Sequence, residues 1–425
     1  MTPRYAEIEA CRICGNRHLD SVFHLGIQHL TGVFPKTAES QRELTSGPLE
    51  LVKCRSGPRG CGLLQLRQSF SPPEMYGANY GYRSSLNRSM VEHLQTRVRR
   101  VTGLVRLQPG DLVLDIGSND GTLLKAYAQS GLDRVGMDPT GDKFRRYYPP
   151  DIRLVADFFS LKAFKAIAGP RRAKVVTSIA MFYDLEDPMD FVRQVGDILA
   201  PDGVWVFEQS YMPAMLQAGS YDTICHEHIE YYALSQIKWM MDRAGMKIVG
   251  LELNDVNGGS FAVTVAKADS PLAADEEAVA KVLAEERAAG LDDMEPYEAF
   301  QHRVLLHRSE LTGFIRSINA GGQKILGYGA STKGNVILQY CGLTSRDLPC
   351  IAEVNEDKFG AVTPGTAIPI VSEREAKAMK PDYLLVLPWH FRDNIIARER
   401  DYLRGGGKLV FPLPGIEVVG VGAGD

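Results

Sequence analysis

The densest group of chemically useful side chains lies in residues 221–232, which read Tyr-Asp-Thr-Ile-Cys-His-Glu-His-Ile-Glu-Tyr-Tyr. Its candidate catalytic residues are His226, Glu227 and His228. An imidazole titrates near neutral pH, and a neighbouring carboxylate can fix its tautomer or bind a hydroxyl group. The zinc-protease pattern H-E-x-x-H needs histidines four apart on a helix, whereas these two are two apart. The segment therefore predicts acid–base catalysis rather than metal binding, with a patch of solvated polar side chains as the alternative.

Four of the seven cysteines fall in two groups near the start of the sequence. Cys11-Arg-Ile-Cys14-Gly has the C-x-x-C-G form of a zinc knuckle, and Cys54 and Cys61 end in the same Cys-Gly pair after a longer spacing. Four thiolates fill a tetrahedral structural zinc site, and a small segment with a poor core needs such a cross-link. Four unrelated free thiols are the alternative. The remaining cysteines are isolated, which favours buried small side chains: Cys225, Cys341 and Cys350.

Residues 112–121, Leu-Val-Leu-Asp-Ile-Gly-Ser-Asn-Asp-Gly, join an apolar run to a glycine turn. An apolar-periodic helix follows Gly121, so the pattern predicts a buried strand, a tight loop and a helix. The backbone N–H groups of such a loop bind a small polar ligand. The glycine spacing is not G-x-G-x-x-G, which argues against a dinucleotide fingerprint. The stretch resembles the first motif of class I methyltransferases, which bind S-adenosylmethionine (SAM).

Acidic residues follow the next two expected strands, at 134–137 and 152–155. Asp138 lies about 20 positions after the glycine loop, where a carboxylate commonly accepts hydrogen bonds from ribose hydroxyls. Asp157 and Phe158 suit the amino group and the face of an adenine. Loop or capping roles are the alternative. The expected cofactor-binding residues are Asp115, Gly117, Ser118, Asn119, Asp120, Asp138, Pro139, Asp157, Phe158 and Ser178.

A sheet must position these motifs, and the sequence has the pattern of one. We expect strands at 112–116, 134–137, 152–155, 174–179 and 203–207, helices between them such as 188–200, and an antiparallel pair at 247–253 and 260–267. This order predicts a doubly wound α/β sheet, which binds ligands at the carboxyl ends of its strands. A charged helical stretch follows at about 271–318, and strands at 383–387 and 408–411 belong to a second, smaller α/β domain.

The expected division is a loop-rich zinc-binding segment at 1–72, a SAM domain at 73–268, a helical connector at 269–318 and a Rossmann-like domain at 319–425. The net charge of −4 argues against general nucleic-acid binding. No apolar run approaches the ~20 residues that span a bilayer, and the first residues lack the apolar core of a signal peptide. We expect a cytoplasmic protein, a monomer or weak dimer, with no membrane partner.

The C-terminal domain opens with a second strand–loop–helix unit, Lys-Ile-Leu-Gly-Tyr-Gly-Ala-Ser-Thr-Lys-Gly-Asn at 324–335. It lacks the P-loop pattern, so an NTPase is not indicated. Small residues and a lysine at a helix N-terminus suit a diphosphate. A glycine turn that packs a strand against a helix is the alternative. The expected substrate contacts here are Tyr328, Ser331, Lys333 and Asn335, with Trp389 and His390 after a later strand placed to flank a base or sugar.

The cysteine-rich segment, the SAM motif, the Glu-His pair and the C-terminal Gly-Tyr-Gly unit together resemble the sugar C-methyltransferases of deoxysugar biosynthesis, over essentially the whole chain. The resemblance implies a zinc-binding N-terminal domain, a SAM-binding middle domain and a Rossmann-like C-terminal domain that helps hold the nucleotide. It implies action on nucleotide-diphosphate 4-keto-6-deoxysugars, typically at C3, with a base from Glu227 and His228. Tyrosines after the zinc segment line the family's site; the corresponding residues are Tyr76, Tyr80 and Tyr82, with Arg83 beside them.

One position departs from the family pattern Ser-Asn-x-x-x-His after the fourth strand, because this chain has Tyr183 there. A phenol donates a hydrogen bond but is not a base at neutral pH. We predict that His228 removes the proton beside a keto group, with hydrogen-bond donors from the tyrosines near the keto oxygen. The rival functions are SAM-dependent O- or N-methylation, epimerisation or isomerisation of the keto sugar without methyl transfer, and a zinc-knuckle interaction protein with a vestigial cofactor domain.

Overall fold

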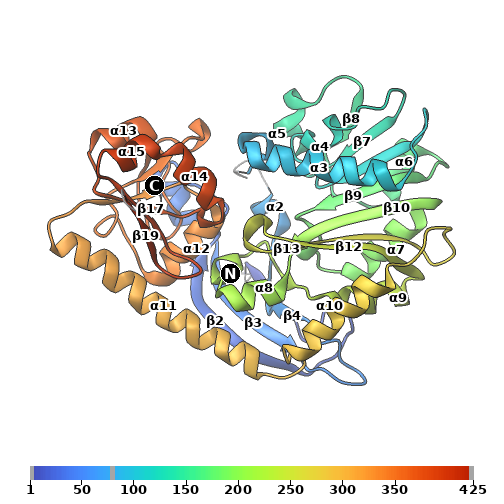
Figure 1. Cartoon of the computed structure of the whole chain (residues 1–425), viewed down its shortest axis with the longest axis horizontal. Helices are drawn as coiled ribbons and strands as arrows, with labels where there is room; N and C mark the ends of the chain where they lie inside the picture. The colour runs from blue at the N-terminus through green and yellow to red at the C-terminus, as the bar shows by residue number, and fades with distance from the viewer. Residues whose placement is uncertain (1–3, 77–81, 421–425) are drawn as a thin grey trace.

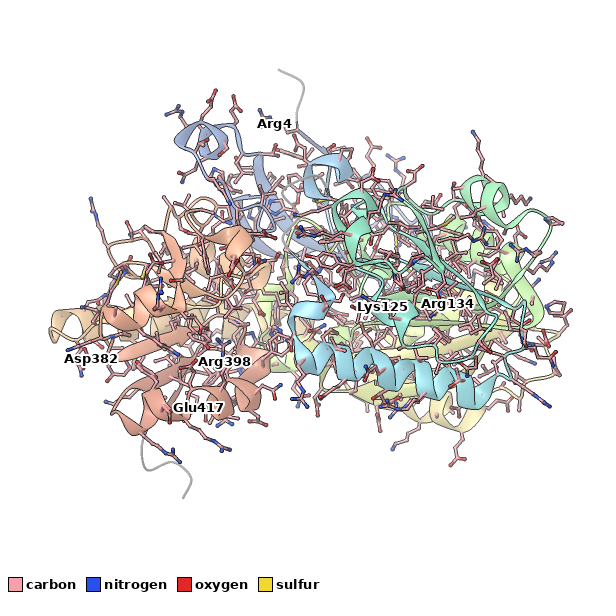
Figure 2. All side chains as sticks on the ribbon, turned by 90° about the horizontal axis from the view of Figure 1, so that it is seen from above. Arg4, Lys125, Arg134, Asp382, Arg398 and Glu417 are labelled. Atoms are coloured by element: carbon pink, nitrogen blue, oxygen red, sulfur yellow. The ribbon has the colours of Figure 1, made fainter. Side chains whose placement is uncertain are left out.

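Two sheets, each with helices around it, stand on either side of a third sheet formed by the N-terminal segment (Figure 1). The computed structural model describes residues 4–76 and 82–420. Figure 2 shows the two outer bodies side by side, one carrying Lys125 and Arg134 and the other carrying Asp382, Arg398 and Glu417. Among the described residues, no helix combines the length and apolar character needed to cross a membrane.

The middle domain, which the sequence predicts to bind SAM and which we call the SAM domain, is built on a sheet with the order β12-β13-β10-β9-β6-β7-β8. Strands β6 to β10 run parallel to one another, and β13 pairs antiparallel with both β10 and β12. The strands are β6 (Leu112–Ile116), β7 (Asp133–Met137), β8 (Ile152–Val155), β9 (Ala173–Ile179), β10 (Leu199–Ser210), β12 (Met246–Asn254) and β13 (Ser260–Lys267). All five residues of β6 are buried, as expected for a strand covered on both faces. The prediction of a doubly wound sheet is confirmed.

Helices of very different length connect these strands. The helices are α3 (Arg88–Leu104), α4 (Thr122–Lys125), α5 (Gly141–Phe144), α6 (Leu161–Ala168), α7 (Pro188–Ile198), α8 (Met212–Ala218) and α9 (Leu234–Arg243). Asp187 caps α7 by accepting a hydrogen bond from the backbone N–H of Asp190, and Pro188 occupies the first helical position.

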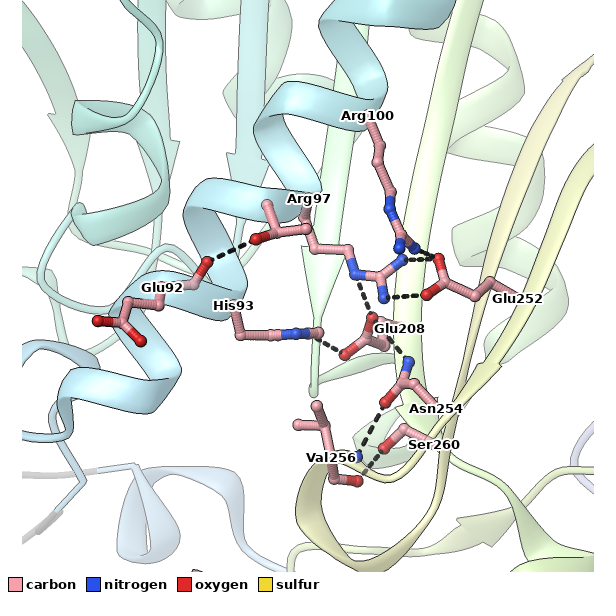
Figure 3. A network of polar contacts seen from close by, with 10 residues as sticks. Glu92, His93, Arg97, Arg100, Glu208, Glu252, Asn254, Val256 and Ser260 are labelled. Atoms are coloured by element: carbon pink, nitrogen blue, oxygen red, sulfur yellow. Dashed lines mark hydrogen bonds and ion pairs between the residues drawn. The ribbon is translucent and has the colours of Figure 1, made fainter. Parts of the chain in front are cut away.

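A buried polar network ties α3 to the sheet (Figure 3). His93 Nε2 lies 2.5 Å from the Glu208 carboxylate, and Arg97 Nε forms an ion pair with the same carboxylate at 2.7 Å. Arg97 also donates to Glu252 on β12 at 2.7 Å. The network joins α3 to β10 and β12, so the segment that enters α3 has a fixed position relative to the sheet.

The N-terminal segment forms a sheet with the order β11-β4-β3-β2 and a separate β1–β5 pair. Its elements are β1 (Tyr5–Glu7), β2 (Leu19–His29), α1 (Ala38–Glu43), β3 (Ser46–Cys54), β4 (Leu64–Leu66), β5 (Gln68–Phe70) and α2 (Pro72–Met75), with β11 (Glu230–Tyr231) supplied from the SAM domain. The prediction of a loop-rich segment is wrong, because the long pair β2–β3 carries much of it. The strand β11 directly follows the His-Glu-His segment and pairs with β4.

The C-terminal domain has a sheet with the order β16-β15-β14-β17-β18-β19, parallel except for β19. Its elements are β14 (Ile325–Tyr328), α12 (Thr332–Cys341), β15 (Ile351–Glu353), β16 (Ile370–Ser372), α13 (Glu373–Ala378), β17 (Tyr383–Val386), α14 (Arg392–Arg398), α15 (Arg400–Arg404), β18 (Lys408–Phe411) and β19 (Glu417–Val419). The second α/β domain predicted from the sequence is present.

Two helices, α10 (Glu276–Ala288) and α11 (Glu295–Ala320), connect the two α/β domains. Seven residues of α11 are buried at spacings of three and four, which places them on one face of the helix: Tyr297, Phe300, Val304, His307, Leu311, Ile315 and Ile318. This face packs against α8, β2, α12 and β14. The connector therefore contacts all three domains rather than bridging solvent (Figure 1).

Candidate active site

The four cysteines predicted to bind zinc come together. Their sulfurs all lie within 4.8 Å of one another, with 3.5 Å between Cys11 and Cys61 and 3.5 Å between Cys14 and Cys54. A tetrahedral zinc ion with bonds of about 2.3 Å holds its sulfurs roughly 3.8 Å apart. Four thiols at these separations fit that ion, whereas four unrelated thiols would not converge. Cys54 ends β3, so the site staples the start of the chain to the N-terminal sheet.

The glycine loop after β6 has the backbone that its sequence predicts. Gly117 and Gly121 adopt φ angles of 74° and 72°, in the left-handed region that favours glycine. A Cβ atom at Gly117 would lie 3.0 Å from the side chain of Met181, which follows β9. The glycine therefore brings this loop into close contact with the carboxyl end of the neighbouring strand, where a ligand of the sheet binds.

Asp138, at the end of β7, is tied to the same loop. Its carboxylate accepts hydrogen bonds from the backbone N–H of Asn119 at 2.7 Å and of Thr140 at 2.6 Å. A carboxylate has about four lone-pair positions, so it still has capacity for a ligand hydroxyl. Asp115 accepts a hydrogen bond from Thr177 Oγ1 at 2.6 Å, and burial raises the pKa of Asp115 to about 7.

The side chains of the loop are held by the segment that precedes α3. Asn119 Oδ1 accepts a hydrogen bond from Ser84 N at 3.0 Å, and Asp120 Oδ2 accepts one from Ser85 N at 3.2 Å. Ser118 Oγ lies 2.8 Å from Tyr148 Oη. Loop residues and the segment after Tyr82 thus form one rigid unit.

The expected cofactor contacts after the third strand are accessible, whereas the one on the fourth strand is buried. Asp157 Oδ1 accepts a hydrogen bond from Phe158 N at 2.8 Å, and the Phe158 side chain is 45% exposed, open to a ligand. Pro139 is half-buried directly after Asp138. Ser178 is buried and accepts a hydrogen bond from Trp205 Nε1 at 2.9 Å, which gives its hydroxyl a partner inside the sheet.

His228 lies beside the residues that follow β9. Its Nδ1 is 2.9 Å from the carbonyl oxygen of Thr223, so Nδ1 carries the hydrogen and Nε2 keeps its lone pair. Among residues 4–76 and 82–420, none hydrogen-bonds to Nε2. The imidazole packs against the Tyr183 ring with 4.3 Å between centroids, and both rings line a small cavity with Thr223 and Tyr231. Burial and, secondly, the charge of Lys333 lower the pKa of His228 to about 3.

Two buried carboxyl groups lie near His228. Asp184 accepts a hydrogen bond from Tyr76 Oη at 2.8 Å, and burial holds the pKa of Asp184 well above its usual value, with the charge of Glu227 adding to the rise. Burial also raises the pKa of Glu227, whose Oε2 has no hydrogen-bond partner among the described residues. The arrangement supplies a neutral base and several hydrogen-bonding groups in one place.

A sequence relative that matches nearly the whole chain decides what kind of protein this is. The chain is 32% identical over 416 residues to the C-methyltransferase NovU of Streptomyces niveus, and the match covers 97% of each chain. The chain belongs to the C-methyltransferase family. Family models match this C-methyltransferase in three stretches: a zinc-binding domain at 11–76, a methyltransferase domain at 90–251 and a C-methyltransferase C-terminal domain at 255–414.

Solved methyltransferase structures match about two fifths of this C-methyltransferase, at low sequence identity. The plantazolicin methyltransferase BpumL with SAH is 11% identical, covers 41% of this chain and 82% of its own, and has a TM-score of 0.33. The CcbJ methyltransferase from Streptomyces caelestis is 15% identical, covers 41% of this chain and 90% of its own, and has a TM-score of 0.32. The family assignment rests on NovU and the family models. The protein is a SAM-dependent C-methyltransferase, and its predicted cofactors, SAM and zinc, are confirmed.

The structure gives several predicted catalytic residues different positions. His226 is fully buried, and its Nε2 lies 3.2 Å from the carbonyl oxygen of Gln28 while its ring packs against Phe70 at 4.6 Å. This placement links His226 to the N-terminal segment, and the catalytic role predicted for it stays a prediction. Tyr82 is 48% exposed, and Tyr80 lies outside the described residues.

The predicted substrate contacts of the C-terminal domain are mostly used inside the protein. Tyr328 Oη donates to Glu399 at 2.8 Å, and Asn335 Nδ2 donates to the carbonyl oxygen of Thr31 at 2.7 Å, both in buried surroundings. Ser331 Oγ caps α12 by accepting from Gly334 N at 3.0 Å. These contacts give the three side chains partners inside the protein, and their binding of substrate stays a prediction.

The other C-terminal candidates lie beside the SAM domain. Trp389 Nε1 donates to Asp222 Oδ2 at 2.8 Å, and Lys333 Nζ donates to the carbonyl oxygen of Asn257 at 3.0 Å. His390 is half-buried next to Trp389. Sequence reasoning missed Asp222, although it lies in the same polar segment as His228. Its position in that segment could have indicated Asp222, but nothing in the sequence pointed to its hydrogen bond with Trp389.

Proposed function

We propose that this C-methyltransferase methylates C3 of a nucleotide-diphosphate 4-keto-deoxysugar and that His228 is the base. The observation that carries the proposal is the orientation of His228. The Thr223 carbonyl oxygen fixes the Nδ1–H tautomer, so Nε2 keeps its lone pair, and the His228 side chain lines a small cavity beside Tyr183. A keto group acidifies the adjacent C–H bond, and a positioned imidazole removes such a proton.

The protonation state of His228 supports this role. Because the pKa of His228 is lowered to about 3, the imidazole is neutral throughout the neutral pH range. An imidazole with so low a pKa is always free to accept a proton at neutral pH but is a weak base, so proton removal also needs a hydrogen-bond donor at the keto oxygen that makes the C–H bond more acidic. We therefore expect the acid limb of the pH–rate profile to lie below pH ~5, where an ordinary histidine would already be protonated.

Hydrogen-bonding groups around His228 suit a sugar. Glu227 Oε2 is buried without a partner among the described residues, and a sugar hydroxyl would satisfy it. Tyr183 and Tyr76 supply phenol hydroxyls near the same place, with Tyr76 bonded to Asp184. Tyr183 stands where a histidine is expected, and a phenol there orients the keto group rather than accepting its proton.

The residues that would hold SAM are Asp138, Asp157 and the backbone of the 117–121 loop. When bound, SAM supplies the methyl group that the substrate carbon takes up. The loop contacts Met181, and Tyr183 beyond it contacts His228, so the proposed cofactor and base positions adjoin through a short run of residues. The buried surroundings exclude water from the carbon that loses its proton.

A hollow of about 880 Å³ supports a diphosphate handle on the sugar. Five cationic residues from all three domains line it: Lys36, Arg83, Lys143, Arg146 and Lys358. Three acids, Glu43, Glu74 and Asp357, also line the hollow, so cations exceed anions. Arg83 stacks on the Tyr147 ring at 4.7 Å, which holds the guanidinium in place. Guanidinium and ammonium groups bind phosphate oxygens through charge-assisted hydrogen bonds.

A panel of nucleoside-diphosphate 4-keto-6-deoxyhexoses, incubated with SAM in D2O and followed by mass spectrometry and NMR, tests the proposal. We expect a gain of one methyl group at C3. The variant His228→Asn should lose at least 1000-fold in turnover and still bind SAM, because the base is gone and the cofactor loop is intact. Deuterium incorporation without a methyl group would instead indicate an epimerase, and a His228→Asn variant with normal turnover would refute the assigned base.

A further inference from the structure

Lys333 reaches out of the C-terminal domain into the surroundings of His228. It is the second residue of α12, and α12 packs against the short 3-10 turn η4 (Tyr221–Thr223) of the SAM domain. Its Nζ donates to the carbonyl oxygen of Asn257, also in the SAM domain, at 3.0 Å. A half-buried ammonium therefore sits across a domain boundary, next to the turn that carries Thr223.

The ammonium has hydrogens to spare. A protonated lysine carries three donors, and within the described chain Lys333 uses one. Nearby polar atoms are also unpartnered among the described residues, namely Asp222 Oδ1 and His390 Nδ1, both in buried positions. Buried polar groups in native proteins are nearly always hydrogen-bonded, so a group of unsatisfied atoms marks the place of a ligand or of ordered water.

The turn η4 connects this group to the base. Thr223 holds His228 through its carbonyl oxygen, and the preceding Asp222 is held by Trp389 at 2.8 Å. The positive charge of Lys333 reaches both neighbours: after burial, it is the next cause of the lowered pKa of His228, and it opposes the raised pKa of Asp222. The turn η4 thus holds the imidazole through Thr223 and packs against α12, which carries the ammonium.

Resting on the proposed function, we propose that Lys333 is a catalytic residue, whose ammonium donates a hydrogen bond to the keto oxygen of the sugar and stabilises the enolate. His228 Nε2 takes the proton from the carbon beside the keto group. The C–H electron pair forms the carbon–carbon double bond, and the carbonyl π pair moves onto oxygen, where Lys333 N–H faces it. Lys333 keeps its proton throughout, and Asp222 and Trp389 are positioning residues.

The diphosphate role predicted for the loop before α12 fits its surroundings less well. A Cβ atom at Gly329 would lie 2.7 Å from Pro388, and one at Gly334 would lie 2.7 Å from Leu387. These glycines serve the close packing of the loop on the end of β17, and Ser331 is used as a cap. The only half-buried cation of this loop points toward Asn257 and the SAM domain.

The test measures exchange of the substrate C3 hydrogen in D2O without SAM, using the accepted member of the nucleoside-diphosphate 4-keto-6-deoxyhexose panel. Lys333→Met should slow exchange and methylation at least 100-fold with KM within threefold, the loss typical of a missing oxyanion donor. Lys333→Arg should retain at least a tenth of the exchange rate, because it keeps the charge. The matched control is Lys324→Met, since Lys324 also donates to a backbone carbonyl oxygen but is exposed at the opposite end of β14.

A second readout separates catalysis from packing. Removing the charge of Lys333 should raise the pKa of His228 and move the acid limb of the exchange rate to higher pH, whereas Lys333→Arg should leave it in place. Exchange by Lys333→Met within threefold of the unmodified enzyme would overturn the proposal, as would a tenfold rise in KM with kcat unchanged. If Lys333→Met does not fold, Lys333→Gln tests the same loss of charge. An unmodified enzyme that neither exchanges nor methylates any sugar would refute the proposed function instead.

Discussion

Two loops of this molecule share one design and serve different ends. In the SAM domain, β6 leads into the 117–121 loop, and the acid at the end of the next strand, Asp138, accepts a hydrogen bond from Asn119 N at 2.7 Å. In the C-terminal domain, β14 leads into the 329–331 loop, and Glu353 at the end of β15 accepts one from Ala330 N at 2.9 Å. The strand, turn and acid are the same in both.

The difference lies in what fills the space above each loop. Glu353 also accepts from Val354 N at 2.7 Å and Asn355 N at 2.9 Å, and Lys358 Nζ donates to the carbonyl oxygen of Ala330 at 2.7 Å. The C-terminal loop is thus saturated by its own domain, while the helix behind it extends Lys333 toward the SAM domain. The comparison teaches that the same strand–loop–helix unit can hold a ligand or deliver a side chain to a neighbour.

The largest expected effect is on SAM affinity, after a substitution in the loop of the SAM domain. Asp138→Asn should weaken SAM binding about 100-fold, roughly 2.7 kcal/mol, because an amide replaces the charged acceptor for the ribose hydroxyls. Isothermal titration calorimetry measures the affinity, with the melting temperature as a control for folding. An affinity within threefold of the unmodified protein would show that Asp138 only shapes the loop.

The matched change in the other loop should act on stability alone. Glu353→Gln should lower the free energy of unfolding by about 2 kcal/mol, since three backbone N–H groups lose a charged acceptor. SAM affinity should stay within twofold. Thermal unfolding and calorimetry on the same preparation check both parts. A SAM affinity that falls as far as in Asp138→Asn would contradict the division of labour between the two loops.

The last expected effect appears only as a change with pH and concerns the strands beneath the loops, where Asp115 in β6 corresponds to Gly327 in β14. Burial raises the pKa of Asp115 to about 7, so between about pH 4 and 7 the folded state binds more protons than the unfolded state. The contribution of Asp115 to stability therefore falls as pH rises through this window. When the pH rises from 5 to 8, the free energy of unfolding of Asp115→Asn should increase by about 2 kcal/mol relative to that of the unmodified protein. Urea unfolding at the two pH values measures the difference, and equal stability differences at both would contradict the raised pKa.

Local patterns in the sequence predicted the elements that carry their own signal. The strands 112–116, 152–155 and 408–411 have the predicted bounds, because each is a short apolar run bounded by turn residues. The four-cysteine cluster followed from spacing alone. The N-terminal sheet did not, because β4 has only three residues and its partner β11 comes from far along the chain.

Contacts between domains were likewise outside the reach of a local pattern. Lys333 was singled out for its place at a helix N-terminus, but its partners Asn257 and Asp222 belong to another domain, and no spacing along the chain encodes that approach. His226 and His228 look equivalent in the sequence. Tertiary packing alone turns one ring onto Gln28 and the other toward the Tyr183 cavity.

The strand β11 begins two residues after His228 and pairs with β4 of the zinc-stapled sheet. His228, the proposed base, therefore lies next to a strand pair that the zinc site helps to hold in place. Chelating the metal should make the position of β11 less fixed and slow proton removal, at a chelator concentration that leaves SAM binding unchanged. The N-terminal domain would in this way support the histidine that we propose as the base, rather than being an appendage to the enzyme.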